Sequence, residues 1–564
     1  MSERPWLNNY DAGVPQTLDY PAIPLFDLLK QAAEKYPDAA CTIFKGARIT
    51  FQEMEEITDR LAAGLADIGV SKGDRVGIFM PNTPQFVMAY FAILKLGAIV
   101  VAVNPLYSAR EIIHQVNDAG LEVMMVMSNF YNLVKEVQPE TKINKVVVTN
   151  IKEALPPILA FLFTLTREKK DGFRIQLAEG DYWMQDLIND FQPEQRPQVD
   201  VSPDDNALFQ YSGGTTGISK AAIAMHRNLV ANAIEIRSWM VEAKDGEETV
   251  LMAIPLFHVY GMVAGMLFGI NTGAALVMVP NPRDLDDLLS NAQKYKTTIF
   301  PGVPTLYNAI NHHPDVLAGK YDLSAIKACI SGSAPLMRET KENFEEITGG
   351  LLFEGYGLSE APTASHCNPL LGENRTGSIG LPLPDVDCRI VSLDDEVTDL
   401  APGEIGELLI KGPMVMKGYH NMPTETANAV RDGWLYTGDI ARMDEDGYFY
   451  IVDRKKELIK PSGYQVWPRE VEEVICEHPK VLESGVAGIP DPYRGESVKA
   501  WVVVKPGETL TEDDIKDWCK DKLANYKVPT QVEFRDELPK TTVGKILRRE
   551  LVREHKESAP EISE

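Results

Sequence analysis

Short apolar runs alternate with helical patterns through the first part of the chain, and this alternation constrains the fold more than any other feature. Arg75–Phe79 is an apolar run, a helical pattern follows from Pro84 to Leu96, and Ala98–Val103 is the next apolar run. Apolar strands joined by a crossover helix are typical of a parallel sheet that is buried on both faces. Val123–Met127 and Lys145–Val148 continue the pattern. The sequence therefore predicts an α/β fold with stacked, mostly parallel sheets.

Polar and glycine-containing turns recur where later apolar runs end. The runs and their turns are Val250–Ile254 with Pro255–Gly261, Thr297–Phe300 with Gly302–Pro304, and Ala328–Ser331 with Gly332–Pro335. Open α/β sheets bind ligands beyond the carboxyl ends of their strands. We therefore expect these three turns to lie at a binding site.

The segment Tyr211–Lys220 reads Tyr-Ser-Gly-Gly-Thr-Thr-Gly-Ile-Ser-Lys and has the composition of an anion-binding loop. It follows the apolar run Asn206–Gln210 and precedes a helical pattern over His226–Met240. Glycines let backbone N–H groups turn toward an anion, threonine hydroxyls add donors, and Lys220 adds a positive charge. A Walker A loop would have glycine directly before the lysine, where this chain has Ser219. The segment predicts a polyphosphate loop of another kind, and a flexible turn is the alternative.

The length and the change of pattern along the chain predict more than one domain. A chain of 564 residues is too long for a single compact core. Short strands and turns prevail from Gly377 onward, and after the charged segment Asp453–Leu458 a compact α+β pattern begins. We therefore expect a large domain over residues 1–454, with a β-rich subdomain over 377–454, and a small α+β domain over 455–564.

The amino-acid composition limits the classes of binding partner and the cellular compartment that are expected for this chain. A net charge of −26 argues against nucleic-acid binding. The six cysteines form no CxxC pair, which predicts reduced thiols and no zinc site. The first residues contain no apolar signal segment, so a cytoplasmic protein is expected. The apolar run Leu155–Leu165, followed by Arg167, Lys169 and Lys170, predicts a covered loop or shallow contact with the inner face of the membrane. Homodimer formation stays open.

Three further motifs follow the anion-binding loop in a fixed order. Gly355–Glu360 combines an aromatic ring, glycines and a carboxylate, Tyr436–Asp439 places an acid at an expected turn, and Pro539–Lys545 ends with a lysine on a glycine turn. Each motif alone is more often a plain turn than a site. Together with Tyr211–Lys220, they resemble the acyl-adenylate-forming enzyme superfamily.

The resemblance is closer to one family, the bacterial long-chain fatty-acid–CoA ligases (acyl-CoA synthetases), and extends from about Pro24 to about Glu554. The segments that carry it are Val103–Tyr107, Phe257–Met262, Ile330–Leu336, Phe534–Lys540 and Gly544–Arg549. It implies ATP- and Mg-dependent conversion of a fatty acid, of long or medium chain, to an acyl-adenylate, followed by transfer to coenzyme A. The chain departs from the family pattern at Ala221, at Ser359 and at Pro461.

The resemblance also implies roles for individual residues. Those expected to contact the nucleotide or coenzyme A are Ser212, Gly213, Gly214, Thr215, Thr216, Gly217, Lys220, Gly332, Ser333, Ala334, Pro335, Glu354, Gly355, Tyr356, Gly357, Ser359, Asp439, Ile451, Arg454, Lys460, Ser462, Gly463, Tyr464 and Lys545. Those expected to line the acyl site are His258, Val259, Tyr260, Gly261, Gly302, Val303, Pro304 and Gly357.

Four of these residues are implied to be catalytic, namely Lys545, Thr215, Glu360 and His258, and Thr215 and Glu360 are implied to bind magnesium. Lys545 would bridge the substrate carboxylate and the α-phosphate, and His258 would gate the acyl site. A core histidine is the alternative for His258. Lys456 would be the hinge of the small domain, while its neighbours Lys455 and Glu457 are expected to be solvated.

Three alternatives remain open. An aryl-acid–CoA ligase of the same fold differs only in the acyl pocket. A peptide-synthetase adenylation domain would require a carrier domain downstream of Lys545. A catalytically silent acyl-nucleotide binding protein is disfavoured because Lys545, Glu360 and Asp439 are all present.

Overall fold

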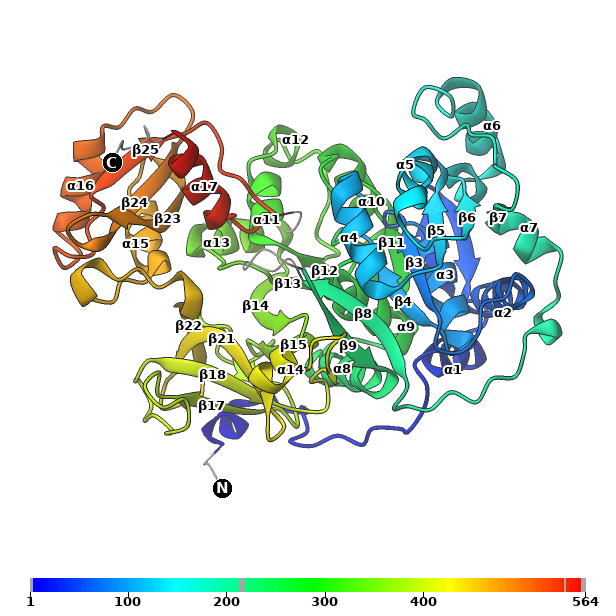
Figure 1. Ribbon diagram of the computed structural model, residues 1–564, viewed down its shortest axis with the longest axis horizontal. Coiled ribbons are helices and arrows are strands. Elements are labelled where there is room, and N and C mark those ends of the chain that lie inside the picture. The colour runs from blue at the N-terminus through cyan, green and yellow to red at the C-terminus, as the bar shows by residue number, and fades with distance from the viewer. Residues whose placement is uncertain (1–3, 213–218, 542–543, 559–564) are drawn as a thin grey trace. The chain divides into compact units, whose positions relative to one another are not determined.

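The computed structural model describes residues 4–212, 219–541 and 544–558, and the chain separates into two compact units (Figure 1). The larger unit contains Trp6–Asp387 and Lys411–Leu435. The smaller unit contains Cys388–Ile410 and the chain from Tyr436 onward. The predicted domain boundary at residues 454–455 falls inside the smaller unit and stays a prediction.

Two mixed sheets form the framework of the described part of the larger unit. In the nine-stranded sheet the neighbouring strands are β16 (Leu381–Pro382), β15 (Ala361–Cys367), β14 (Leu351–Leu358), β13 (Ala328–Ser331), β12 (Ile299–Gly302), β10 (Thr249–Met252), β11 (Ala275–Met278), β1 (Ala40–Phe44) and β2 (Ala47–Thr50). In the eight-stranded sheet they are β19 (Gly418–Tyr419), β9 (Lys220–Met225), β8 (Asn206–Ser212), β4 (Ile99–Ala102), β3 (Arg75–Phe79), β5 (Val123–Met127), β6 (Lys145–Thr149) and β7 (Tyr182–Trp183). The central pairs of both sheets are parallel, as the apolar runs predict.

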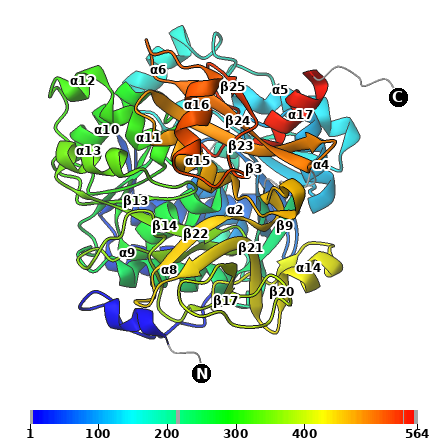
Figure 2. The same ribbon diagram turned by 90° about the vertical axis from the view of Figure 1, so that its left-hand side faces the viewer.

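Helices cover these sheets and account for the helical patterns of the sequence (Figures 1 and 2). They are α1 (Asp27–Lys35), α2 (Phe51–Asp67), α3 (Pro84–Lys95), α4 (Ala109–Ala119), α5 (Tyr131–Val137), α6 (Pro157–Thr166), α7 (Met184–Asn189), α8 (His226–Trp239), the π-helix η6 (Tyr260–Leu267), α9 (Phe268–Thr272), α10 (Leu285–Tyr295), α11 (Pro304–Asn311), α12 (Pro314–Leu317), α13 (Arg338–Thr348) and α14 (Pro423–Ala429). Every residue of α3 is buried, as expected for a helix that is apolar on all sides and packed within a core. Helices α4 and α5 pack their apolar residues on the β3–β6 sheet.

Asn82, in the turn after β3, joins the two sheets. Its buried side-chain amide donates to the carbonyls of Met252 (2.9 Å) and Ile254 (2.8 Å), and its Oδ1 accepts the amide of Leu256 (2.8 Å). Ile254 and Leu256 lie beyond β10, so these two backbone groups need partners from outside its sheet, whereas the carbonyl of Met252 also accepts the amide of Val279 (3.3 Å). One side chain from the other sheet therefore determines the path of the chain toward Pro255–Gly261.

The smaller unit combines an antiparallel sheet with a three-stranded α/β layer. The antiparallel strands are β17 (Asp387–Val391), β18 (Gly406–Lys411), β21 (Trp434–Met443) and β22 (Phe449–Arg454). The first two residues of β21 belong to the larger unit and pair there with β20 (Val430–Arg431). The layer contains β23 (Val481–Asp491), β24 (Gly495–Val504) and β25 (Gln531–Phe534), with α15 (Pro468–Cys476), α16 (Glu512–Lys520) and α17 (Arg548–Ser558). Helices α15 and α16 pack on one face of it, and Leu551 of α17 packs on the other.

The predicted α/β fold class is confirmed, and four local expectations are wrong. Leu155–Leu165 is not the predicted loop, because the chain from Pro157 onward forms the exposed helix α6. The acid expected at a turn, Asp439, lies inside β21 because it pairs with Arg454 of β22. Of the expected turn at 355–360, residues 355–358 continue β14, and only Ser359 and Glu360 turn into β15. Lys455 and Glu457 are not solvated: Lys455 bonds to Glu396 (2.6 Å) and Glu407 (2.7 Å), and Glu457 is bound by Arg548.

Two other observations bear on the sequence analysis. All six cysteines are free, as predicted. Among the residues that the structure describes, no helix has the length and apolar character needed to cross a bilayer.

We predict that Asn82→Ala lowers the free energy of unfolding of the larger unit by about 3 kcal/mol or more, because the buried backbone groups of Ile254 and Leu256 lose their partners and the carbonyl of Met252 loses one of two donors. The measurement is urea unfolding followed by tryptophan fluorescence. Asn144→Ala, which removes one exposed amide, is the control and should change stability by less than about 0.5 kcal/mol. Equal stability of the two variants would contradict a joining role for Asn82.

Candidate functional site

The carboxyl ends of three parallel strands meet at one edge of the nine-stranded sheet. Gly302 of β12 is in register with Ser331 of β13, and Ser331 is in register with Glu354 of β14. The turns that follow Gly302 and Ser331 therefore start side by side, whereas β14 continues past Glu354 to Leu358. This arrangement brings together Gly302–Pro304 and Gly332–Pro335, two of the three turns that the sequence predicts at a binding site.

Tyr260 ties the segment after β10 to this edge. Its buried hydroxyl group lies 2.6 Å from the carbonyl of Ile330 and 3.1 Å from that of Gly302. A Cβ atom on Gly332 would lie 3.2 Å from the Tyr260 ring, and a Cβ on Gly261 would lie 2.5 Å from the carbonyl oxygen of Pro255. Both glycines are therefore needed for close packing at this edge.

His258 precedes η6 and is half-buried, and Val259 and Tyr260 after it are buried. The Tyr260 amide donates to Nδ1 of His258 (3.2 Å). Desolvation lowers the pKa of His258 to about 4, so the ring is neutral at physiological pH. A neutral ring that accepts at Nδ1 carries its proton on Nε2. The charge-free ring is suited to an apolar ligand more than to proton transfer.

Glu354 supports the turn after β13. Its buried carboxylate accepts the amides of Leu336 (3.0 Å) and Gly377 (3.2 Å). The amide of Leu336 closes the turn Gly332–Pro335, in which Ser333 has a positive φ of 71°. Glu354 therefore holds this turn in place through the backbone, and its expected contact with a nucleotide stays a prediction.

Tyr356 and Gly357 lie at the end of β14. The Tyr356 ring packs edge-on against His366, with 5.7 Å between ring centroids. A Cβ atom on Gly357 would lie 1.2 Å from the carbonyl oxygen of Thr363, so only glycine fits. Gly357 is among the predicted site residues, but only the pairing of β14 with β15 shows why this position requires glycine.

Glu360 lies in the tight turn between β14 and β15, and a residue that the sequence analysis missed holds it. The hydroxyl of Tyr419 donates to Oε1 of Glu360 (2.8 Å), and the amide of Met416 donates to the Glu360 carbonyl (2.8 Å). Nζ of Lys220 lies 5.3 Å from the centroid of the Tyr419 ring. Tyr419 thus connects the lysine that ends the anion-binding segment with the carboxylate expected to bind magnesium. It belongs to β19, which pairs with β9, and no local sequence pattern indicates that pairing.

Part of the anion-binding segment falls outside the described residues. Gly213, Gly214, Thr215, Thr216 and Gly217 are in this part, and Ser212 is the last residue of β8. After the gap, Lys220 and Ala221 begin β9, which pairs with β8. Ala221 is buried in this strand and has an ordinary strand conformation.

Asp439 and Arg454 form an ion pair in the smaller unit. The two residues face each other across β21 and β22, and Nε of Arg454 lies 3.0 Å from Oδ1 of Asp439. Asp439 is buried, whereas Arg454 is partly exposed. Ile451, further back on β22, accepts a hydrogen bond at its carbonyl from Arg469 (2.8 Å). The pair offers a fixed carboxylate and a cation side by side.

Lys545 follows the turn at Gly544, whose φ is 78°. Its amide donates to Oγ1 of Thr541 (3.1 Å). Desolvation and, next, the positive charge of Arg454 lower the pKa of Lys545 to about 8, although the carboxylates of Glu457 and Asp439 oppose the shift. Lys545 therefore lies within electrostatic reach of the Asp439–Arg454 pair.

Arg548, a second residue missed by the sequence analysis, fixes the segment that carries Lys545. Its guanidinium binds Glu472 (2.6 Å), Asp453 (3.0 Å) and Glu457. These partners come from α15, from β22 and from the segment after β22. Because a guanidinium presents a rigid fork of donors, one side chain can hold three elements together.

The segment Lys460–Tyr464, which is expected to contact coenzyme A, also lies in the smaller unit. Lys460 is exposed, and its amide donates to Glu496 (2.8 Å). Ser462 has a φ of 53°, and its amide donates to the carbonyl of Arg494 (2.8 Å). The exposed ring of Tyr464 stacks on Tyr526, with centroids 4.6 Å apart. Gly463 lies between them in the short helix η8 (Pro461–Gly463), and Lys456 is exposed in η7 (Lys455–Glu457).

Comparisons with known proteins agree with this picture. Residues 29–420 match the family model described as AMP-binding enzyme, and residues 470–545 match that of the AMP-binding enzyme C-terminal domain. A long-chain-fatty-acid–CoA ligase of Bacillus subtilis is 42% identical over 560 residues, covering 99% of both chains. ATP-bound MatB from Rhodopseudomonas palustris has a TM-score of 0.81 at 26% identity, over 95% of this chain and 99% of that chain. The anthranilate CoA ligase AuaEII with anthranoyl-AMP has a TM-score of 0.82 at 27% identity, over 95% and 98% of the two chains.

We predict that Tyr419→Phe raises the magnesium concentration needed for half-maximal pyrophosphate release by about tenfold, because Glu360 loses a hydrogen bond to a charged group. The ring that faces Lys220 is kept, so the maximal rate at saturating magnesium should change much less. Magnesium titration of pyrophosphate release measures both quantities. Tyr493→Phe, at a tyrosine that is 93% exposed, is the control. An unchanged titration for Tyr419→Phe would contradict the positioning role.

Proposed function

The chain belongs to the AMP-binding enzyme family, and we propose that it is a fatty-acid–CoA ligase. In the first step a fatty-acid carboxylate oxygen attacks the α-phosphorus of ATP, and pyrophosphate leaves. In the second step the thiolate sulfur of coenzyme A attacks the acyl carbonyl carbon, and AMP leaves. The observation that carries this proposal is the 42% identity to a long-chain-fatty-acid–CoA ligase along nearly the whole of both chains.

We assign to Lys545 the central role in the first step. The fatty acid is already ionised at neutral pH, so no general base is needed to form the nucleophile. The difficulty is that two anions must approach each other, and a fixed cation between them stabilises the charge that develops. Binding next to two anions would return the lowered pKa of Lys545 toward its usual value.

Residues of the anion-binding segment and of β14 would hold the triphosphate, the adenine and the metal. Thr215, Thr216 and the amides of their loop would bind the β- and γ-phosphates, with Lys220 close by. Tyr356 would stack on the adenine, with the turn Gly332–Pro335 on its other side. Glu360 and Thr215 offer oxygen ligands, which suit Mg²⁺, and when bound the ion neutralises phosphate charge.

The ribose would bind to the smaller unit. Asp439 would accept hydrogen bonds from the ribose hydroxyls, and Arg454, its ion-pair partner, would add a donor. Ile451 on the neighbouring strand would pack beside them. Because the Asp439–Arg454 pair is formed without a ligand, little side-chain order would have to be created on binding.

The acyl chain would lie along His258–Gly261 and Gly302–Pro304. The support is the neutral ring of His258 and the close packing of Gly261 and Gly302 at the sheet edge. The ring would open or close the acyl site without taking part in proton transfer.

The second step requires coenzyme A to reach the acyl carbonyl. We propose that the chain after Lys456 turns about this residue, so that Ser462, Gly463 and Tyr464 replace Lys545 at the reacting group, with Lys460 near the nucleotide of coenzyme A. Hinges are a few residues at the end of an element that absorb a change of φ and ψ. Lys456 lies two residues after the end of β22 and is exposed, which leaves room for such a change.

An aryl-acid–CoA ligase is the second candidate, because AuaEII, a solved anthranilate CoA ligase, has the same fold. The higher identity to the fatty-acid enzyme favours the first candidate. A non-catalytic acyl-nucleotide binding protein would not need the cluster of Lys545, Asp439 and Arg454. A cytoplasmic location and a homodimer stay predictions.

We predict that Lys545→Ala slows acyl-adenylate formation by roughly a hundredfold to a thousandfold, since removal of one stabilising group at a developing charge has costs of this size. Thioester formation from supplied acyl-adenylate should be largely unchanged. For the unchanged protein, kcat/KM of the first step should fall as the pH rises through about 8, where Lys545 loses its proton.

The control for this prediction is Lys540→Ala, which removes a nearby lysine that pairs with Glu483. Pyrophosphate release and coenzyme A-dependent AMP release, measured separately, distinguish the two steps. Equal loss of both steps in Lys545→Ala would contradict the assignment.

We predict that apparent affinity rises by about fourfold for each added methylene until the acyl pocket is full, because a buried CH₂ contributes about 0.8 kcal/mol. Competition among saturated fatty acids of increasing length and cinnamate-like acids measures this preference. If the aryl acids bind more tightly than decanoate and palmitate, the aryl-acid ligase is the better assignment.

A further inference from the structure

Helix α6 (Pro157–Thr166) presents an apolar surface that no described part of the protein covers. None of its ten residues is buried. Ile158 is 76% exposed, Phe161 65% and Leu165 66%, and Leu159 and Leu162 are exposed too. Single exposed apolar residues are common, but five within one helix form a patch of the kind that marks an interaction site.

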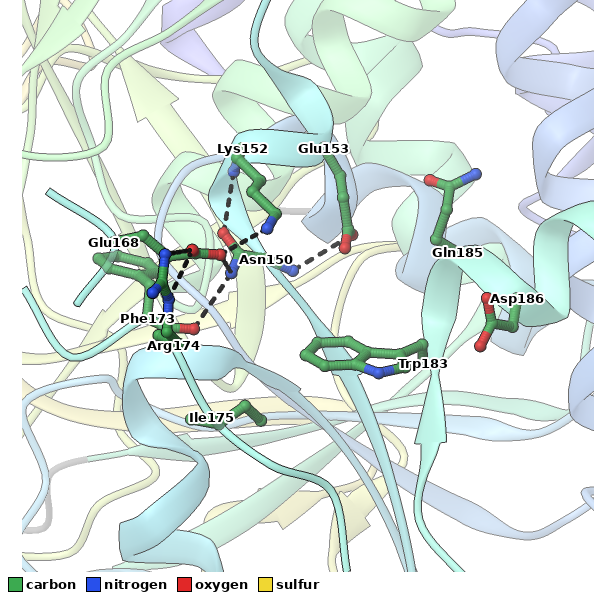
Figure 3. A pocket seen from close by; sticks show the side chains of 10 residues that line it. All are labelled: Asn150, Lys152, Glu153, Glu168, Phe173, Arg174, Ile175, Trp183, Gln185 and Asp186. Atoms are coloured by element: carbon green, nitrogen blue, oxygen red, sulfur yellow. Dashed lines mark hydrogen bonds and ion pairs between the residues drawn. The ribbon is translucent and has the colours of Figure 1, made fainter. Parts of the chain in front are cut away.

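The helix is nevertheless firmly held by the residues that follow it (Figure 3). Glu168 is buried and accepts hydrogen bonds from Lys152 (2.5 Å), Arg174 (3.1 Å) and Asn150 (3.2 Å). Arg174 also donates to the carbonyl of Thr164 in the last turn of α6 (3.1 Å). This polar network thus anchors the end of α6, which lies at the edge of the larger unit (Figure 1), and the apolar side chains of the helix are exposed.

The cavity beside this network does not explain the apolar helix. It has a volume of about 460 Å³, and Lys152 and Arg174 line it together with Glu153, Glu168 and Asp186 (Figure 3). Three carboxylates and two cations give a lining that does not favour an anion, and the apolar side chains of α6 are not part of it. A binding partner of α6 would therefore contact the exposed apolar side chains of the helix and not this cavity.

The charge around α6 is distributed unevenly. No acidic residue occurs from Ala154 to Arg167, although the chain as a whole carries a net charge of −26. Lys169 and Lys170 follow the helix, are exposed, and form no ion pair with a described residue. Arg167 lies 3.6 Å from Asp171, the one acidic side chain directly after them that is exposed. An apolar helix next to exposed lysines is complementary to a surface that is both apolar and negatively charged.

We propose that α6 and the segment Arg167–Lys170 dock on an anionic lipid bilayer, with the helix lying in the headgroup region and its apolar side chains inserted. A helix of ten residues is about 15 Å long, half the thickness of the hydrocarbon core, so it can lie in the interface but not span it. Membrane docking through α6 does not depend on the catalytic activity of the protein. It would place the protein where long-chain fatty acids concentrate.

The test is flotation of the full chain with vesicles of phosphatidylcholine, with or without phosphatidylglycerol, in the absence of ATP and coenzyme A. We expect binding to the anionic vesicles and loss of that binding in the triple variant Ile158→Gln, Phe161→Gln, Leu165→Gln. The matched control is Leu317→Gln, Leu371→Gln, Val397→Gln, which removes three exposed apolar side chains elsewhere. The control variant should bind as the unchanged protein does, and thermal unfolding should show that both variants are folded.

A second pair of variants tests the charges. Lys169→Gln with Lys170→Gln should weaken partitioning onto anionic vesicles by roughly tenfold to thirtyfold. Lys30→Gln with Lys142→Gln, at exposed lysines elsewhere, should leave partitioning unchanged. The proposal is overturned if the unchanged protein does not float with anionic vesicles, or if the two triple variants bind equally. It is also overturned if sedimentation velocity shows that the α6 triple variant only converts a dimer to monomers, since the patch is then an interface between copies.

Discussion

The register of the parallel strands β12, β13 and β14 is the constraint on which the site of the larger unit depends. Gly302, Ser331 and Glu354 lie side by side in this register, so the turns after Gly302 and Ser331 start at one edge of the sheet, next to the end of β14. The hydroxyl of Tyr260 lies within hydrogen-bond distance of backbone carbonyls in two neighbouring strands there. A slip of one residue would turn every side chain of a strand to the opposite face. The register of the sheet therefore also determines the positions of the site residues at its edge.

In the smaller unit, ion pairs do more than strand register to position the site residues. The buried Asp439 is paired with Arg454, and Arg548 holds three carboxylates around the segment of Lys545. Burial of this many charges is tolerated only when each one has partners. One consequence is the lowered pKa of Lys545, which has lost part of its hydration before any ligand arrives. A lysine in this state gains more from an anionic ligand than a fully hydrated one would.

Side chains that act through the backbone support both units. The side chain of Asn82 forms hydrogen bonds with three backbone groups at and after the end of β10. The carboxylate of Glu354 accepts the backbone amides of Leu336, after β13, and of Gly377. Tyr419 holds Glu360 in a similar way, although by a side-chain contact. In each case a residue distant in sequence determines the geometry of a turn. Polar groups at the ends of strands cannot be left unsatisfied, and this requirement explains why such residues occur.

The sequence by itself determined the parallel α/β framework, the strand ends that form the site, and the order of the motifs, because apolar periodicity and glycine turns are local properties. It also indicated Asp439, Glu360 and Lys545 through resemblance. Only the tertiary structure showed that Asp439 lies in a strand, that Gly357 faces the Thr363 carbonyl, and that Tyr419, Arg548 and Asn82 hold the site residues. It also showed that Leu155–Leu165 is an exposed helix and not a covered loop. The contacts of Tyr419, Arg548 and Asn82 join segments from 59 to 174 residues apart, which no local pattern of residues records.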